Sequence, residues 1–184
     1  MGSVALALEE GGDPGITGWS LHDVAATDLD GLPTTVAPVG EPPLAIAARH
    51  PNTAVRIDHL VVFTPDLKRT VAVLEGAGLD LRRLRDPTEP GPPVRQAFFR
   101  LGEVILEVAE APGADDGPAS FWGITFRVAD IDACARLLGE RMGEVRDAVQ
   151  PGRRIATARR DAGLGLPVAF ISERDGGSRS PRSP

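Results

Sequence analysis

The sequence predicts an α+β fold built from two copies of one unit, in which a strand, a helix and three further strands follow in order. Three observations lead to this prediction. Between residues 55 and 173, hydrophobic periods typical of strands and of helices alternate in that order. The same order then returns, with Leu60 corresponding to Ile124 and Leu74 to Leu138. Each helix also starts behind an aspartate suited to an N-cap, Asp66 or Asp130.

The first unit opens with a buried strand at 57–63, which is rich in β-branched and aromatic side chains. A helix follows, capped by Asp66 and ended by Gly76 and Gly78. The remaining strands are expected at 79–85, 94–101 and 103–110, the last two as a hairpin around Gly102.

The second unit repeats this plan. Its first strand is expected at 122–128, and its helix places Ile131, Ala135, Leu138 and Met142 on one face. Three strands at 144–149, 153–160 and 167–172 complete it. Units that cannot bury their hydrophobic faces alone pack on each other, so the two should form one body.

Composition divides the chain of 184 residues into three zones. Residues 1–54 are poorly patterned and form either a partly ordered extension or the remnant of another module. Weak strand signals occur there at 4–8 and 16–24, and a proline-spaced loop at 32–43. Residues 55–173 form the main domain, with modules 55–111 and 121–173. The tail 174–184 has no apolar side chain and is expected to be disordered.

Composition also excludes several classes of protein. Cys134 is the only cysteine, which rules out an internal disulfide and a multi-cysteine metal site, and it is expected to be a packing residue. The net charge is −6, and no basic stripe with interleaved aromatic residues is present, so no nucleic-acid partner is expected. No stretch approaches about 18 apolar residues, so we expect a cytoplasmic protein with no membrane partner.

Three stretches carry a resemblance to a known family: RIDHLVVFTPDLKRTVAVLEGAGLDL, RQAFFRLGEVILEVAE and FWGITFRVADIDACARLLGE. They resemble the vicinal oxygen chelate superfamily, which includes glyoxalase I, bleomycin-resistance proteins and extradiol dioxygenases. The resemblance covers residues 55–173. It implies two paired βαβββ modules that form a cup-shaped mixed sheet with the helices outside. It also implies a divalent metal in the cup, held by the first and fourth strands of each module.

Carried onto this chain, the resemblance places His59 and Glu107 at the metal-ligand positions of the first module. Strand alternation independently puts His59 on the cup face, together with Ile57, Val61 and Phe63. Glu107 lies among apolar neighbours, where an ionised carboxylate is costly unless it is paired or coordinated. Imidazole and carboxylate together suit Fe, Mn, Ni, Co or Zn.

The second module departs from the family pattern. Gly123 stands where the second histidine would be, and Ile171 or Ser172 stands at the second carboxylate position. Because catalytic metal sites normally have at least three protein ligands, any metal is expected to be weakly held or absent. The alternative is that His59 is a core histidine hydrogen-bonded to Glu107.

The other inward positions of the second module suggest a ligand site. Alternation places Gly123, Thr125 and Arg127 toward the cup, and the third strand adds Arg153 or Arg154. Together with Thr125, the guanidinium groups of Arg127 and Arg153 would hold an anionic ligand. The alternative is that the arginines of the third strand are solvated charges at a sheet edge.

Two functions remain open from the sequence. The first is a glyoxalase-like enzyme, a lyase, isomerase or dioxygenase, in which a divalent metal at His59 and Glu107 polarises a small substrate and Glu107 is catalytic. The second is a metal-free protein of the bleomycin-resistance type that binds or sequesters a small molecule. In both, the partner is a small molecule and the protein is a monomer or a homodimer.

Overall fold

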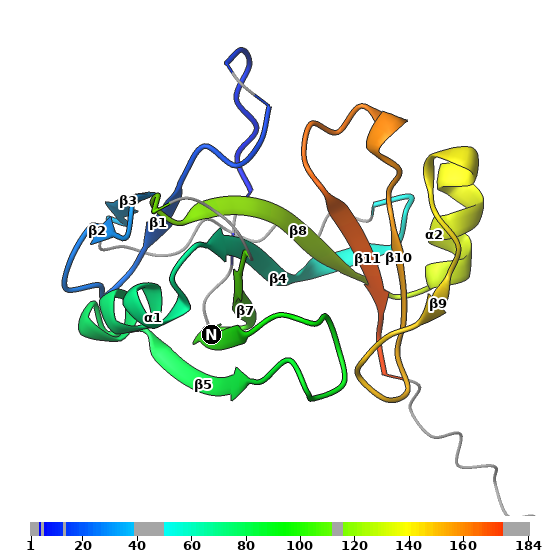
Figure 1. Ribbon diagram of the computed structural model, residues 1–184. Helices are drawn as coiled ribbons and strands as arrows, with labels where there is room; N and C mark the ends of the chain where they lie inside the picture. Colours follow the sequence, from blue (N-terminus) through cyan, green and yellow to red (C-terminus); the bar gives the residue numbers. More distant parts are fainter. Residues whose placement is uncertain (1–3, 5, 13, 39–49, 112–115, 175–184) are drawn as a thin grey trace, which may run out of the picture.

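The computed structural model describes residues 4, 6–12, 14–38, 50–111 and 116–174, and its main part is one curved, eight-stranded mixed sheet (Figure 1). The first module consists of β4 (Ala54–Thr64), α1 (Leu67–Gly76), β5 (Asp80–Arg85), β6 (Gln96–Leu101) and β7 (Val104–Glu110). The second consists of β8 (Ser120–Val128), α2 (Ile131–Leu138), β9 (Arg146–Asp147), β10 (Arg154–Thr157) and β11 (Val168–Ser172). The predicted α+β class with two paired βαβββ modules is therefore confirmed.

The strand order shows how the modules join. It is β5-β6-β7-β4-β8-β11-β10-β9, so the first strands of the two modules, β4 and β8, meet as antiparallel neighbours in the middle. On either side, β4 pairs with β7 and β8 pairs with β11, both in parallel. The sheet is open, because β5 and β9 at its ends are not paired with each other.

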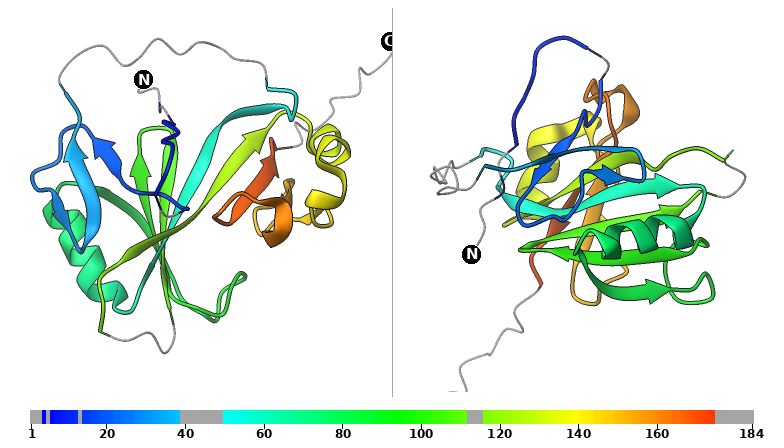
Figure 2. Two further views of the ribbon diagram at one scale, coloured as in Figure 1. Left: turned by 90° about the horizontal axis from the view of Figure 1, so that it is seen from above. Right: turned by 90° about the vertical axis from the view of Figure 1, so that its left-hand side faces the viewer.

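Both helices cover the outer face of this sheet, as Figure 2 shows from two further directions. Their first turns are capped as predicted. Asp66 accepts a hydrogen bond from the backbone N–H of Arg69 at 3.0 Å, and Asp130 accepts one from that of Ala133 at 2.9 Å. The second helix is shorter than its hydrophobic period indicates, because a 3₁₀ turn, Gly139–Arg141, follows Leu138.

A hydrophobic cluster lies under each helix, so burial of these two clusters holds the helices to the sheet. Under α1 the fully buried side chains include Val62, Leu74, Phe99, Leu106 and Val108. Under α2 they include Val128, Ile131 and Cys134. Burial raises the pKa of the Cys134 thiol to about 11, in keeping with a packing residue.

The N-terminal region differs from expectation. The loop predicted for 32–43 is wrong in its first part, since β3 (Leu32–Val36) is the central strand of a three-stranded sheet with β1 (Trp19–Leu21) and β2 (Asp28–Leu29). The loop was predicted because Pro33 has no backbone N–H to donate to a neighbouring strand. Burial of Leu32, which is 2% exposed, stabilises the strand despite this missing hydrogen bond. The strand expected at 4–8 is also wrong in its described residues, which are not strand. Most of the predicted tail, 175–184, lies outside the described residues.

This small sheet is fastened to α1. Asp30 accepts hydrogen bonds from Arg69 at 2.9 Å and from the hydroxyl of Thr70 at 2.5 Å. Trp19 packs edge-on against Phe121, with ring centroids 5.2 Å apart. No helix in the described part of the chain is long and apolar enough to cross a membrane.

We expect Leu32→Ala to lower the free energy of unfolding by about 2–5 kcal/mol, because it opens a cavity in the cluster under α1. Leu8→Ala is the matched control, since Leu8 is 91% exposed and its loss should change little. Urea denaturation followed by circular dichroism measures both. Equal stability of the two variants would show that the N-terminal sheet is not part of the core.

Candidate functional site

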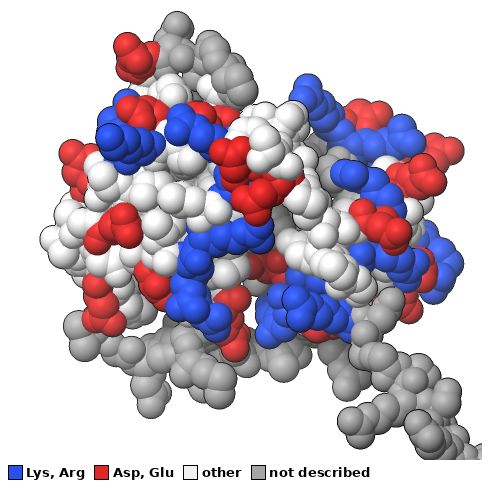
Figure 3. All heavy atoms as spheres, turned by 60° about the horizontal axis from the view of Figure 1, so that its bottom comes forward, with Lys and Arg blue, Asp and Glu red and all other residues white. Residues whose placement is uncertain are grey.

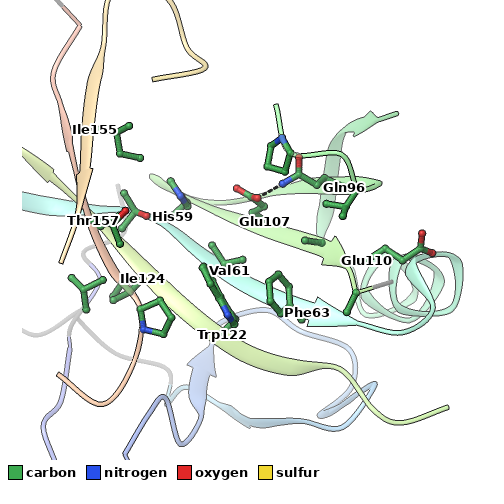
Figure 4. Close-up of a pocket in the computed structure, with 18 of the residues that line it drawn as sticks. His59, Val61, Phe63, Gln96, Glu107, Glu110, Trp122, Ile124, Ile155 and Thr157 are labelled. Atoms are coloured by element: carbon green, nitrogen blue, oxygen red, sulfur yellow. Dashed lines mark hydrogen bonds between the residues drawn. The ribbon is translucent and has the colours of Figure 1, made fainter. Parts of the chain in front are cut away.

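A cavity of about 520 Å³ lies in the concave side of the sheet and is lined from both modules (Figure 4). Most of its wall is apolar. The polar side chains in the lining are His59, Gln96, Glu107, Glu110, Thr125, Arg146 and Thr157. A largely apolar cavity of this size with a few polar groups is typical of sites for small organic molecules.

Strand β4 places three predicted residues in the cavity wall, His59, Val61 and Phe63. Ile57 was expected beside them, and this is wrong: it packs in the cluster under α2. The pairing of β4 with β8 shifts register between Ile57 and His59. Such a β-bulge inserts an extra residue and reverses the alternation on one side of it.

The bulge brings Asp58 into contact with His59. The carboxylate Oδ2 of Asp58 lies 3.0 Å from Nδ1 of His59. The other carboxylate oxygen of Asp58, Oδ1, accepts hydrogen bonds from Nε of Arg127 at 2.7 Å and from Nη2 of Arg153 at 2.9 Å. When Nδ1–H of His59 donates to Asp58, Nε2 is left as the free nitrogen of the ring, available to the cavity.

Asp58 is almost fully buried, at 6% exposure. Burial by itself would raise the pKa of its carboxyl, but the hydrogen bonds from His59, Arg153 and Arg127 outweigh this effect. The pKa of Asp58 therefore lies well below its usual range, and the group is a carboxylate at neutral pH.

Glu107 faces His59 from the neighbouring strand β7 (Figure 4). Burial among apolar neighbours raises the pKa of its carboxyl, although His59, Arg85 and Gln96 partly oppose the rise. The amide N–H of Gln96 donates to Glu107, so the direct His59–Glu107 hydrogen bond considered from the sequence is not observed in the described part of the chain. His59 and Glu107 thus each have a different partner and share the cavity.

Behind Glu107, the hydrogen bonds continue to a loop. The side-chain oxygen of Gln96 accepts from Nε of Arg85 at 2.5 Å. Arg85 is buried at 5% exposure and donates to the backbone oxygens of Glu89 at 3.1 Å and Val94 at 2.9 Å. This guanidinium group therefore holds the loop 86–95, which supplies Pro92 and Val94 to the cavity wall.

The predicted ligand-binding residues separate into two groups. Thr125 lines the cavity. Arg127 and Arg153 are not among the lining residues, because both donate to Asp58. A ligand-binding role for these three residues stays a prediction.

The second module supplies no metal ligand at the two corresponding positions. A Cβ atom on Gly123 would lie 2.7 Å from the backbone oxygen of Pro167, so no side chain fits there. Ile171 is fully buried, and the hydroxyl of Ser172 donates to the backbone oxygen of Glu173. Among the described residues, no group of three or more His, Cys, Asp and Glu side chains is arranged so that it could hold a metal ion. Two protein ligands do not fit a resident catalytic metal.

Sequence reasoning missed many of the lining residues, among them Trp122, Gln96 and Arg146. Trp122 is in the wall against Phe63, with ring centroids 4.9 Å apart, because a second register shift in β4 follows Val61. Gln96 and Arg146 stand at strand ends, and no hydrophobic period marks them. For Gln96, the one available signal was that a polar residue stands at the start of a mostly apolar strand of the hairpin.

Two βαβββ modules around a shared cavity define the class of this protein. The sequence model of the Glyoxalase/Bleomycin resistance protein/Dioxygenase superfamily matches residues 56–176. The chain belongs to this superfamily, which confirms the resemblance to vicinal oxygen chelate proteins. Comparison with curated protein sequences gives no significant match.

Solved structures show the same fold. Methylmalonyl-CoA epimerase from Mycobacterium tuberculosis is 17% identical, with a TM-score of 0.52 over 65% of this chain and 89% of that one. A hypothetical protein from Bacillus halodurans is 19% identical, with a TM-score of 0.53 over 65% and 95%. A variant of the Streptomyces coelicolor methylmalonyl-CoA epimerase, in complex with 2-nitronate-propionyl-CoA, is 26% identical, with a TM-score of 0.51 over 65% and 98%.

We expect Asp58→Asn to lower the free energy of unfolding at pH 7 by about 3–5 kcal/mol, because it leaves Arg127 and Arg153 without their buried counter-charge. Folding lowers the pKa of this carboxyl, so its charge stabilises the protein at pH values above the pKa in the unfolded chain, about 3.9. This stabilisation is lost as the pH falls from there through the pKa in the folded protein. The difference between wild type and variant should therefore shrink below about pH 4.

Urea denaturation at pH 7 and pH 3 measures this difference. Asp80→Asn is the control, because Asp80 forms an exposed pair with Arg82 and should contribute little. A difference between wild type and Asp58→Asn that stays constant with pH would contradict the assigned charge.

Proposed function

We propose that this protein binds a small, mostly apolar molecule in the cup without a resident metal, and that His59 and Glu107 are its main polar contacts. The observation that carries the proposal is the cavity wall: it is apolar over most of its area, while the imidazole and the carboxyl face each other at one place. Apolar walls supply affinity, and a few placed polar groups fix the orientation of a ligand.

The polar groups indicate what part of a ligand they would meet. With Nδ1 of His59 bonded to Asp58, Nε2 is the ring nitrogen left for a ligand, and in the neutral imidazole it accepts a hydrogen bond. The carboxyl of Glu107, with its raised pKa, donates one when it is protonated. The hydroxyls of Thr125 and Thr157 lie in the same lining and can do either. A hydroxyl or carbonyl oxygen on an apolar ring or chain fits this set.

A second candidate is an enzyme that transfers a proton on a small molecule, with Glu107 as the catalytic group. Burial next to a histidine is the observation that favours it, because burial raises the pKa of the Glu107 carboxyl and so makes its carboxylate form a stronger proton acceptor. Similar structures include epimerases of methylmalonyl-CoA, as their names state. A divalent metal, Fe, Mn, Ni, Co or Zn, would have His59 and Glu107 as its protein ligands and would be weakly held.

Metal analysis tests the part of the proposal that concerns a resident metal. We expect protein purified without a histidine tag to contain far less than one metal ion per chain, because the cup offers two protein ligands. Mass spectrometry of the metal content should give the same low value for wild type, His59→Ala and Glu107→Gln. Stoichiometric metal that is lost in both variants would establish the metal-dependent alternative instead.

Binding of a neutral apolar probe tests the cup itself. We expect 2-naphthamide to quench the fluorescence of Trp122, which lies in the wall. Ala169→Phe places a ring into the cavity from β11 and should weaken binding at least about tenfold, since it removes contact area worth more than 1.4 kcal/mol. Leu164→Phe adds the same ring at an exposed position outside the lining and is the control. Equal binding by both variants would contradict the proposal.

The remaining assignments are also proposals. A cytoplasmic location and a monomer or homodimer fit a small-molecule binding protein with a single cysteine. The acidic net charge fits a protein without a nucleic-acid partner.

A further inference from the structure

Arg146 differs from the other arginines around the cavity. It lies on β9, opposite Ile155 of β10, and both side chains contribute to the lining. Its side chain makes no hydrogen bond or ion pair with any described residue. In contrast, Arg127 and Arg153 are bound by Asp58, and Arg85 is bound by loop carbonyls.

The other charges in the lining do not neutralise Arg146. Glu110 accepts a hydrogen bond from Nε of Arg95 at 2.8 Å and so already has a cationic partner. Glu107 accepts a hydrogen bond from Gln96, and the charges that act on it are those of His59 and Arg85. Within the described lining, Arg146 is thus a full positive charge without a counter-charge, at the edge of an apolar cavity.

The molecule does not have the charge distribution of a polyanion-binding protein. Figure 3 shows basic and acidic side chains interspersed over one face of the molecule. The chain as a whole is acidic, with a net charge of −6. A protein that binds polyanions shows a clustered basic surface instead. An isolated guanidinium next to an apolar wall is suited to one anionic group on an otherwise apolar molecule.

We propose that Arg146 binds the anionic oxygen group, a carboxylate or a phosphate, of a ligand whose apolar body fills the cup. This inference rests on the proposed function, since it requires a ligand in the cavity. Arg146 is then a specificity-determining residue: the guanidinium at the rim selects the anion, while His59 and Glu107 contact the other end. A cavity of about 520 Å³ accommodates an anion of this kind with one or two rings.

Three probes with one ring system test the proposal: 2-naphthoate, the neutral 2-naphthamide and 2-naphthyl phosphate. Their affinities are measured by titration calorimetry for wild type, Arg146→Gln and Arg100→Gln. Arg100 is the matched control, because it is an exposed arginine on β6 that is likewise outside every described ion pair and does not line the cavity. Both variants lose one positive charge, so any effect of the protein's net charge on anion binding is the same in both.

We expect wild type to bind 2-naphthoate or 2-naphthyl phosphate more tightly than 2-naphthamide, and the preferred anion identifies the ligand's acid group. Arg146→Gln should weaken binding of that anion about tenfold, as loss of a partly exposed charge-assisted hydrogen bond does. Its affinity for 2-naphthamide should stay within about twofold. Arg100→Gln should change neither affinity. Added salt should weaken binding of the anion to wild type and leave 2-naphthamide unaffected.

Three other outcomes would overturn the inference. If 2-naphthamide binds as tightly as the anions, or if Arg146→Gln and Arg100→Gln have equal effects, Arg146 is a solvated edge charge and the proposed function still stands. If no probe binds to wild type, the proposed function fails, and the inference fails with it. Thermal denaturation of both variants checks that each is folded.

Discussion

The buried carboxylate of Asp58 is the contact on which the geometry of the cup depends. It belongs to β4 of the first module, while its partners Arg127 and Arg153 belong to the second. One carboxylate therefore ties the two modules together at the point where their first strands pair. The same group accepts the hydrogen bond from His59 and so fixes the direction of the imidazole. The interface between the modules and the site thus share one residue, so a change at Asp58 affects both.

Much of the fold could be predicted because its signals are local and repeated. The N-caps at Asp66 and Asp130 and the hydrophobic periods of both helices are readable in short windows of sequence. Alternation also placed His59, Val61 and Phe63 on one face of β4. These predictions depend only on the period of a strand or a helix. The repeated order of the elements then indicates the two paired modules.

The predictions that failed depend on how strands pair. A β-bulge does not change the hydrophobic pattern of its own strand, so nothing in the sequence showed that Ile57 turns away from the cup. For the same reason, Asp58 was not expected to be the partner of Arg127 and Arg153. Pro33 indicated a loop, whereas Leu32 is buried in the cluster under α1 and the segment forms strand β3. In each case a contact distant in sequence decided the local structure.

The hydrogen-bonded series from Glu107 through Gln96 to Arg85 connects the cavity wall to the loop 86–95. Arg85 does not line the cavity, yet it sets the shape of the loop that supplies Pro92 and Val94 to the wall. Gln96 is therefore the side chain through which Glu107 and the loop are connected. One glutamine thus supports both the buried carboxyl of Glu107 and, through Arg85, the loop that forms one side of the cavity wall.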